Sequence, residues 1–223
     1  MPANPSRAEG PPDTHRSSAS RVALTFDAEH PDRPLCPSGN TERILDILEA
    51  AGVRASFFVQ SRWATAHPAL ARRMADDGHV VGHHSKYHVP MPLLSDDGLR
   101  ADIQEGEQEI MAATGVDPRP LFRCPFGAGR EDPRVLDALR ARGYREVHHH
   151  VMAEDWEPWR TPDEVTAAVC EGVLDRDGAD TVVLLHTWPG PTAAALPRIL
   201  ERLLPAGVQF VGVDQLTREG TAP

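Results

Sequence analysis

Thr181-Val182-Val183-Leu184-Leu185 is a nearly unbroken run of aliphatic residues. Such a run is typical of a strand buried on both faces, as strands are in a parallel sheet covered by helices. From residue 21 onward, other short β-rich runs alternate with longer amphipathic runs. This alternation favours parallel strands joined by helices, and we therefore expect an α/β fold.

The rest of the chain supplies further units of the same kind. We expect strands over residues 21–26, 55–59, 79–82, 121–123, 146–152, 181–185 and 208–213. We expect helices over residues 41–51, 68–77, 95–114, 133–142, 161–174 and 196–204. About seven β-α units without internal repeats imply a barrel-like sheet in which the strand carboxyl ends form the active face. A doubly wound open sheet has the same pattern, so periodicity does not separate the two.

Length and composition indicate one globular domain, with 223 residues of which 40% are hydrophobic. We expect a disordered leader over residues 1–20, the folded domain over 21–218 and a tail over 219–223. The net charge of -10 and the lack of a basic block argue against a nucleic-acid or anionic-membrane partner. The apolar runs stay below the ~18 residues of a transmembrane helix. Because Cys36, Cys124 and Cys170 lack paired spacing, we expect a reducing compartment. Because residues 1–21 do not read as a secretion signal and no transmembrane run follows, we expect a cytoplasmic location.

Several polar residues follow the expected strands. His84 and His88 have a spacing that can place two imidazoles on one side of a helical turn, as ligands of a divalent metal. Asp27 and Arg123 each follow an apolar run, and His186 follows the aliphatic run quoted above. Because parallel strands end at the same edge of a sheet, we expect these side chains to share one pocket.

Five segments that carry such residues occur in a fixed order along the chain. They are Thr25-Phe26-Asp27, His84-Ser85-Lys86-Tyr87-His88, Arg123-Cys124-Pro125-Phe126-Gly127, Asp155-Trp156 and Leu184-Leu185-His186. Together they resemble the ordered motifs of the polysaccharide deacetylases, the NodB-homology or carbohydrate esterase 4 group, over roughly residues 22–216. The resemblance implies a single-domain, distorted (β/α)7 barrel. It also implies metal-dependent removal of acetyl groups from N-acetylated sugars.

The resemblance implies a role for each residue around the metal. His84 and His88 match the two histidine ligands of a divalent ion, which we expect to be zinc, with cobalt or another divalent ion as alternatives. Asp27 matches the general base that takes a proton from the attacking water. Arg123 matches the arginine whose guanidinium pairs with that aspartate and orients it.

The remaining motif residues would act on the substrate. His186 matches the general acid that protonates the leaving amine, and Asp155 would hold its imidazole charged and oriented. The backbone N–H of Phe126 matches a donor to the oxyanion, although Phe126 stands where Tyr is commoner. Trp156 and Leu184 match the pair that forms an apolar slot for the acetyl methyl group.

Position 28 departs from the family pattern, in which a second aspartate completes the metal ligands. Ala28 has no donor atom, whereas Glu29 fits a version of the motif with the acid one residue later. We expect Glu29 to be the third ligand, with His30 or Asp27 as substitutes. Two histidines without such a third ligand would hold metal weakly.

Further histidines and tryptophans lie outside the motifs. We expect His148-His149-His150 to lie in a strand, with one or two of them lining the pocket and His149 pointing opposite to its neighbours. Trp159 and Trp188 lie just after motif segments and are candidates to stack on a sugar ring.

The sequence therefore predicts a metal-dependent hydrolase that releases acetate from an N-acetylated sugar or sugar-containing metabolite. We expect a soluble small-molecule or oligosaccharide substrate. An allantoinase-like hydrolase of a non-sugar or cyclic amide, or a non-catalytic carbohydrate-binding relative, stays open. The acyl acceptor and the oligomeric state are also open.

Overall fold

The computed structural model describes residues 20–30, 36–176 and 178–216. The strands are β1 (Arg21–Ala28), β2 (Ser56–Val59), β3 (Val80–His83), β4 (Leu121–Phe122), β5 (Arg145–Glu146), β6 (Val151–Met152), β7 (Thr181–His186) and β8 (Gln209–Phe210). The α-helices are α1 (Asn40–Ala51), α2 (Ser61–Ala66), α3 (Pro68–Asp76), α4 (Asp96–Thr114), α5 (Pro133–Ala141), α6 (Pro162–Leu174), α7 (Gly190–Leu203) and α8 (Val213–Leu216). Two 3-10 turns, η1 (Met91–Leu93) and η2 (Pro125–Gly127), complete the described elements. Except for residue 20, the predicted leader and tail lie outside these residues.

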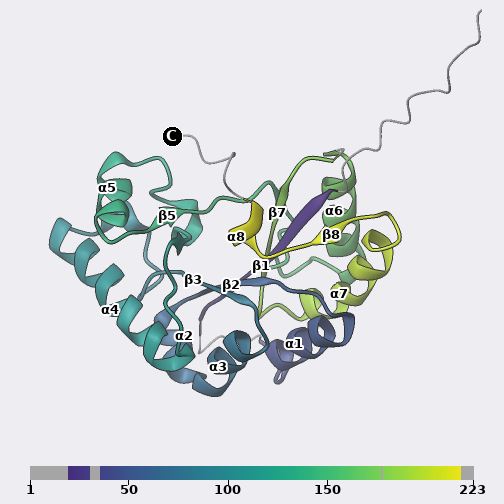
Figure 1. The fold of residues 1–223 in the computed structure, drawn as a ribbon, viewed down its shortest axis with the longest axis horizontal. Coiled ribbons are helices and arrows are strands. Elements are labelled where there is room, and N and C mark those ends of the chain that lie inside the picture. Colours follow the sequence, from purple (N-terminus) through teal and green to yellow (C-terminus); the bar gives the residue numbers. More distant parts are fainter. Residues whose placement is uncertain (1–19, 31–35, 177, 217–223) are drawn as a thin grey trace, which may run out of the picture.

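The strands form one parallel sheet with the order β5-β4-β3-β2-β1-β7-β6, and β8 pairs with the first two residues of β1. Helices surround the curled sheet on its outside (Figure 1). Within the described residues, β5 and β6 are the two edges and do not pair with each other. The expected distorted (β/α)7 barrel is therefore confirmed, as a single domain.

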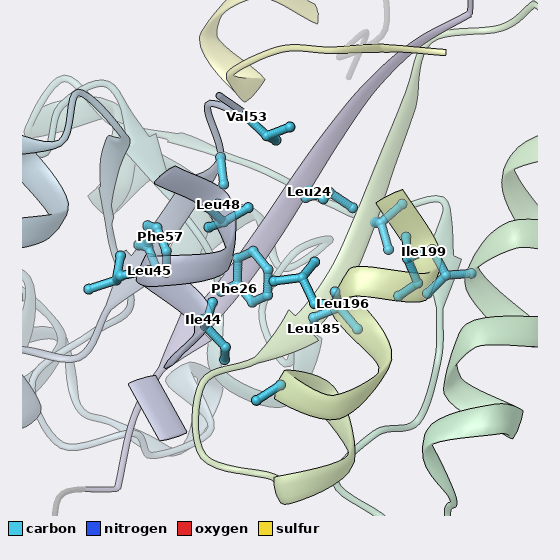
Figure 2. Close-up of a cluster of buried hydrophobic side chains, with 14 of the residues drawn as sticks. Leu24, Phe26, Ile44, Leu45, Leu48, Val53, Phe57, Leu185, Leu196 and Ile199 are labelled. Atoms are coloured by element: carbon cyan, nitrogen blue, oxygen red, sulfur yellow. The ribbon is translucent and has the colours of Figure 1, made fainter. Parts of the chain in front are cut away.

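Alternation along β1 separates the core from the opposite face of the sheet. Leu24, Phe26 and Ala28 point into the largest hydrophobic cluster, which is packed against helices α1 and α7 (Figure 2). The ring of Phe26 stacks on Phe57 of β2, with 5.2 Å between the centroids. Because successive side chains of a strand point to opposite faces, Asp27 lies on the side away from this cluster. The strand thus directs its one acidic residue, Asp27, into the barrel.

Most expected elements are present, with ends that differ by a few residues. Helix α6 begins at the expected cap, because the Thr161 side chain accepts from the N–H of Glu164 while the Glu164 carboxylate accepts from the N–H of Thr161. Helices α2 and α8 were not predicted from the sequence. The start predicted for α7, residue 196, lies after its observed start at Gly190. Among the described helices, none is long and apolar enough to cross a membrane.

The prediction of one strand over residues 146–152 is wrong. Strand β5 pairs with β4 at one edge of the sheet, whereas β6 pairs with β7 at the other edge. The segment 147–150 connects the two edges, and we call it the bridge segment. Its ends are held by hydrogen bonds from the N–H of Val147 to Phe122 O and from the N–H of His150 to Val182 O. A strand cannot continue here because the segment has no neighbouring strand along its length.

The helical turn expected for His84 and His88 is also absent. Both lie in the loop that follows β3, and the backbone φ angles of Ser85 and His88 are 61° and 54°. Such left-handed conformations are costly for residues with a Cβ, and they require support from the surroundings. The carboxylate of Asp102 provides it by accepting from the backbone N–H groups of Lys86 and Tyr87.

Candidate functional site

A cavity of about 650 Å³ lies at the carboxyl ends of the strands. The following residues line it: Asp27, Glu29, His30, His84, His88, Arg123, Cys124, Phe126, Gly127, Arg130, Glu146, Val147, His148, His149, Met152, Trp156, Leu184, His186 and Trp188. Of the candidate site residues, only Asp155 is missing from this lining, and it contacts His186 from behind. The structure therefore brings the predicted residues into one pocket.

Glu29, His84 and His88 form a compact group of buried potential ligands. One ligand atom from each lies within 4.8 Å of the other two. Glu29 Oε2 lies 3.3 Å from His84 Nε2 and directly beside His88 Nε2. All three side chains are buried, so the group is shielded from solvent. Two imidazoles and one carboxylate are a frequent ligand set for zinc.

The hydrogen bonds around the group suit a metal site. His84 Nδ1–H donates to the carbonyl oxygen of Arg123 at 2.8 Å, which leaves Nε2 directed at Glu29. Glu29 Oε2 is buried and accepts no hydrogen bond within the described residues. An unsatisfied buried carboxylate oxygen is costly unless a cation lies near it. The residues present therefore fit a divalent cation.

Electrostatics keep the Glu29 carboxylate ionised. Burial raises the pKa of Glu29, but the neighbouring His30, His84 and His88 outweigh burial and hold that pKa well below its usual range. Burial lowers the pKa of His88, which favours the neutral imidazole that a metal needs.

Asp27 and Arg123 form a buried ion pair beside this group. Arg123 Nη1–H donates to Asp27 Oδ1 at 2.7 Å, and Nε–H donates to Val147 O at 3.2 Å. The guanidinium lies over the ring of Phe58, 4.0 Å from its centroid. Asp27 Oδ2 lies 3.5 Å from His84 Nε2. One carboxylate oxygen is thus fixed by arginine while the other faces the candidate metal ligands.

Asp155 and His186 form a second charged pair, and His186 lies beside Asp27 because the two residues are partners in the β1–β7 ladder. His186 Nδ1–H donates to Asp155 Oδ1 at 2.8 Å, and the backbone N–H of His186 donates to Oδ2 at 2.8 Å. The Thr192 hydroxyl also donates to Oδ2. Burial lowers the pKa of His186, but the charge and hydrogen bond of Asp155 outweigh burial and raise that pKa to about 9. His186 is therefore a proton donor at neutral pH.

The three predicted substrate-binding residues lie around these polar groups. Trp156 packs edge-on against His186, with 5.1 Å between ring centroids. Leu184 lies on β7, two residues before His186. Phe126 has a left-handed φ of 58°, and its ring contacts His88 at a centroid distance of 4.5 Å. Its backbone N–H is not bonded to any described residue. A strained residue with an available N–H at a pocket is suited to bind an oxyanion.

Other expectations met mixed outcomes. His148 and His149 line the cavity as predicted, but the bridge segment replaces the strand that was expected to orient them. Trp159 is 71% exposed and does not line the cavity, whereas Trp188 does. Cys124 is buried, and burial raises its thiol pKa, as expected for an inert packed side chain.

Arg130 and Glu146 are among the cavity-lining residues that the sequence did not predict. Arg130 contacts His148, with 3.0 Å between Nη1 and Nε2. Glu146 is shielded enough that burial raises its pKa to about 7. Both belong to loops or short edge strands without a periodic pattern, so only a three-dimensional arrangement reveals them.

Comparison with known proteins agrees with the fold and the motifs. The model of the polysaccharide deacetylase family matches residues 14–147. The peptidoglycan-N-acetylglucosamine deacetylase PgdA of Listeria monocytogenes is 32% identical over 96% of this chain, which spans 42% of that protein. The family 4 carbohydrate esterase of Streptomyces lividans, solved in complex with acetate, is 32% identical with a TM-score of 0.76, covering 92% of this chain and 98% of that one.

A third similar protein differs in its described activity. It is a family 4 pseudoenzyme from Bacillus anthracis, 26% identical with a TM-score of 0.76, and the alignment covers 90% of this chain and 66% of that one. Together with the family-model match, the shared fold and the five motifs in order, these similarities show that the chain belongs to the polysaccharide deacetylase family.

Proposed function

We propose that this protein is a metal-dependent hydrolase that removes the N-acetyl group from an N-acetylated sugar or sugar-containing compound and releases acetate. The observation that carries the proposal is the convergence of three elements on one cavity. These are the ligand group Glu29, His84 and His88, the pair Asp27–Arg123 and the pair Asp155–His186.

The ligand group would hold a divalent cation such as zinc or cobalt through Glu29 Oε2 and the two imidazoles. When bound, such an ion supplies Lewis acidity, which lowers the pKa of water and polarises a carbonyl. Asp27 then takes the proton of the attacking water at Oδ2, because Arg123 holds Oδ1. The guanidinium also keeps this carboxylate in a fixed orientation, which favours a defined line of attack.

Four further cavity residues act on the acetamide group. The Phe126 N–H donates to the carbonyl oxygen as negative charge develops there. Trp156 and Leu184 give the acetyl methyl group an apolar contact. His186 protonates the departing nitrogen, since the Asp155 carboxylate keeps the imidazole charged. The products are acetate and a free amine.

The substrate is proposed at the level of a class. Named relatives act on peptidoglycan, and a cavity of about 650 Å³ accommodates one or a few sugar units. We propose a soluble N-acetylated sugar or oligosaccharide, with peptidoglycan fragments as the polymer-derived candidates. The cytoplasmic location remains a prediction.

Acetate release after metal reconstitution tests this function. The purified chain is treated with a chelator, reloaded with zinc or cobalt, and assayed on N-acetylated monosaccharides, oligosaccharides and peptidoglycan fragments. We expect acetate release that depends on metal. Asp27→Asn should bind metal but release at least about 100-fold less acetate, because it cannot accept the proton. Ring opening of a cyclic amide without acetate release would instead support the allantoinase-like function.

A non-catalytic carbohydrate-binding function is the second candidate. Its support is the pseudoenzyme among the similar structures, together with Ala28 in place of the common second aspartate. Metal binding and sugar affinity without hydrolysis of any acetamide in the panel would favour it. The presence of both acid–base pairs around one cavity favours the enzyme.

A further inference from the structure

The ends of β1 and β7 lie side by side and bring a tryptophan close to Glu29. Asp27 pairs with His186 in the parallel ladder, and the N–H of Thr187 continues the ladder by donating to Asp27 O at 3.1 Å. Two residues further along the chain, just past the ends of β1 and β7, come Glu29 and Trp188. Side chains alternate along β1, so Asp27 points away from the main hydrophobic cluster, and Glu29 and Trp188, just past the strand ends, line the same cavity as Asp27 and His186.

The same alternation explains why Ala28 is not part of the metal group. Ala28 is fully buried in the main hydrophobic cluster, on the face opposite to Asp27. A ligand from the end of β1 must therefore come from position 29. Glutamate has one more rotatable bond than aspartate, so its carboxylate needs an additional contact to stay in one place.

Trp188 supplies that contact. Its Nε1–H donates to Glu29 Oε1 at 3.1 Å, and His30 Nε2 lies 3.3 Å from the same oxygen. The other oxygen, Oε2, faces the imidazoles of His84 and His88 and accepts no hydrogen bond among the described residues. One oxygen is thus held by a donor, and the other is directed at the candidate metal position.

An indole N–H is well suited to this task. It can only donate and does not titrate, so it favours the ionised carboxylate at any pH in the working range. Trp188 is 6% exposed, and the bond is shielded from competing water. The backbone beside it is also fixed, because the buried Asn40 side chain donates to Thr187 O at 2.7 Å and to Pro189 O at 3.0 Å.

We propose that Trp188 is the positioning residue that makes Glu29 the third metal ligand, in place of the aspartate missing at position 28. This inference rests on the proposed metal-dependent function. It goes beyond that function by assigning a role to a residue outside the motifs. Hydrogen-bonded neighbours of metal ligands typically contribute 10- to 100-fold to metal affinity, so Trp188→Phe should weaken zinc binding by about this factor.

Zinc and cobalt affinities are measured by chelator competition on the full chain, for the parent, Glu29→Ala, Trp188→Phe and the double variant. Trp156→Phe is the matched control, because it also removes a pocket indole N–H, which donates to Glu157 and not to Glu29. We expect Trp188→Phe to weaken binding and Trp156→Phe to leave it within about twofold, which is small beside the effect of a neighbour of a ligand. The visible spectrum of bound cobalt should change with Trp188→Phe and not with Trp156→Phe.

The double variant separates a specific role from a general one. If Trp188 acts through Glu29, the loss from Trp188→Phe should largely disappear in the Glu29→Ala background, since the two effects are then not additive. Additive losses would overturn the proposal, and this holds even if Trp188→Phe lowers the stability of the metal-free protein.

The outcomes also separate this inference from the proposed function. Near-parent affinity in Trp188→Phe together with a large loss in Glu29→Ala would overturn the role of Trp188 and leave the metal site intact. A parent protein that binds neither zinc nor cobalt would overturn the proposed function as well.

Discussion

Replacing Asp155 by Asn should change the pH dependence of catalysis, because Asp155 sets the charge of His186. Burial lowers the pKa of His186, yet Asp155 first, and then Glu29 and Asp27, raise the pKa from 6.5 to about 9. At about 1.4 kcal/mol per pH unit, this corresponds to roughly 3 kcal/mol in favour of the imidazolium. The largest opposing interactions come from Asp155, so most of this stabilisation should be lost in Asp155→Asn.

The direction of the change follows from the role of the group. A general acid works only while it is protonated, so the rate of the parent should fall as the pH rises through about 9. In Asp155→Asn, burial is no longer offset, and the fall should begin at least about one pH unit lower. The rate at neutral pH should also drop by about 100-fold or more, the usual contribution of a general acid.

The assay is kcat/KM for acetate release, measured across this pH range at saturating metal. Thr192→Val is the matched control, because it removes a hydroxyl that donates to Asp155 Oδ2 but leaves the carboxylate and its bond to His186. This control should retain the descending limb of the parent. An Asp155→Asn enzyme whose rate falls at the same pH as the parent would refute the assignment of that limb to His186.

Three further predictions concern the ion pair, the metal and the core. Arg123→Lys should lower kcat by about 100-fold with unchanged metal stoichiometry, because one ammonium group cannot reproduce the bonds to both Asp27 and Val147; a near-parent kcat would contradict this. Chelation should abolish acetate release and lower the unfolding temperature, since metal at about 100 times its Kd adds about 2.7 kcal/mol to stability. Calorimetry with and without metal checks this, and identical unfolding temperatures would count against the metal site. Phe26→Ala should lower the free energy of unfolding in denaturant by about 3–5 kcal/mol, because the ring is fully buried against Phe57; a loss below about 1 kcal/mol would contradict the described packing.

The sequence predicts the elements that have a strong local signal. The aliphatic run of β7 indicates a strand buried on both faces, and Thr161 followed by Pro162 marks the start of α6. The motif residues follow strand ends, so their convergence could be expected from the properties of parallel sheets. Glu29 was predicted because Ala28 has no donor atom, and the structure places it beside His84 and His88.

The parts that were not predicted depend on contacts between distant residues. The bridge segment reads as a strand by composition, but its two ends bond to opposite edges of the sheet. The loop that carries His84 and His88 is held in a left-handed conformation by Asp102, which lies far along the chain. The bond between Trp188 and Glu29 requires the register of β1 and β7, which no local pattern reveals.

Under the proposed function, the bridge segment would contribute to substrate choice, whereas the charged pairs and the ligand group would carry out catalysis. Asp27 and His186 are partners in the sheet ladder, and His84 directly follows a ladder position, so a shift of backbone there would disturb the sheet. His148 and His149, in contrast, form part of the cavity wall from a stretch that is tied to the sheet at its ends. Side chains there can be exchanged with little effect on the reacting groups. A pocket built in this way can acquire new substrates through its wall while its chemistry stays the same.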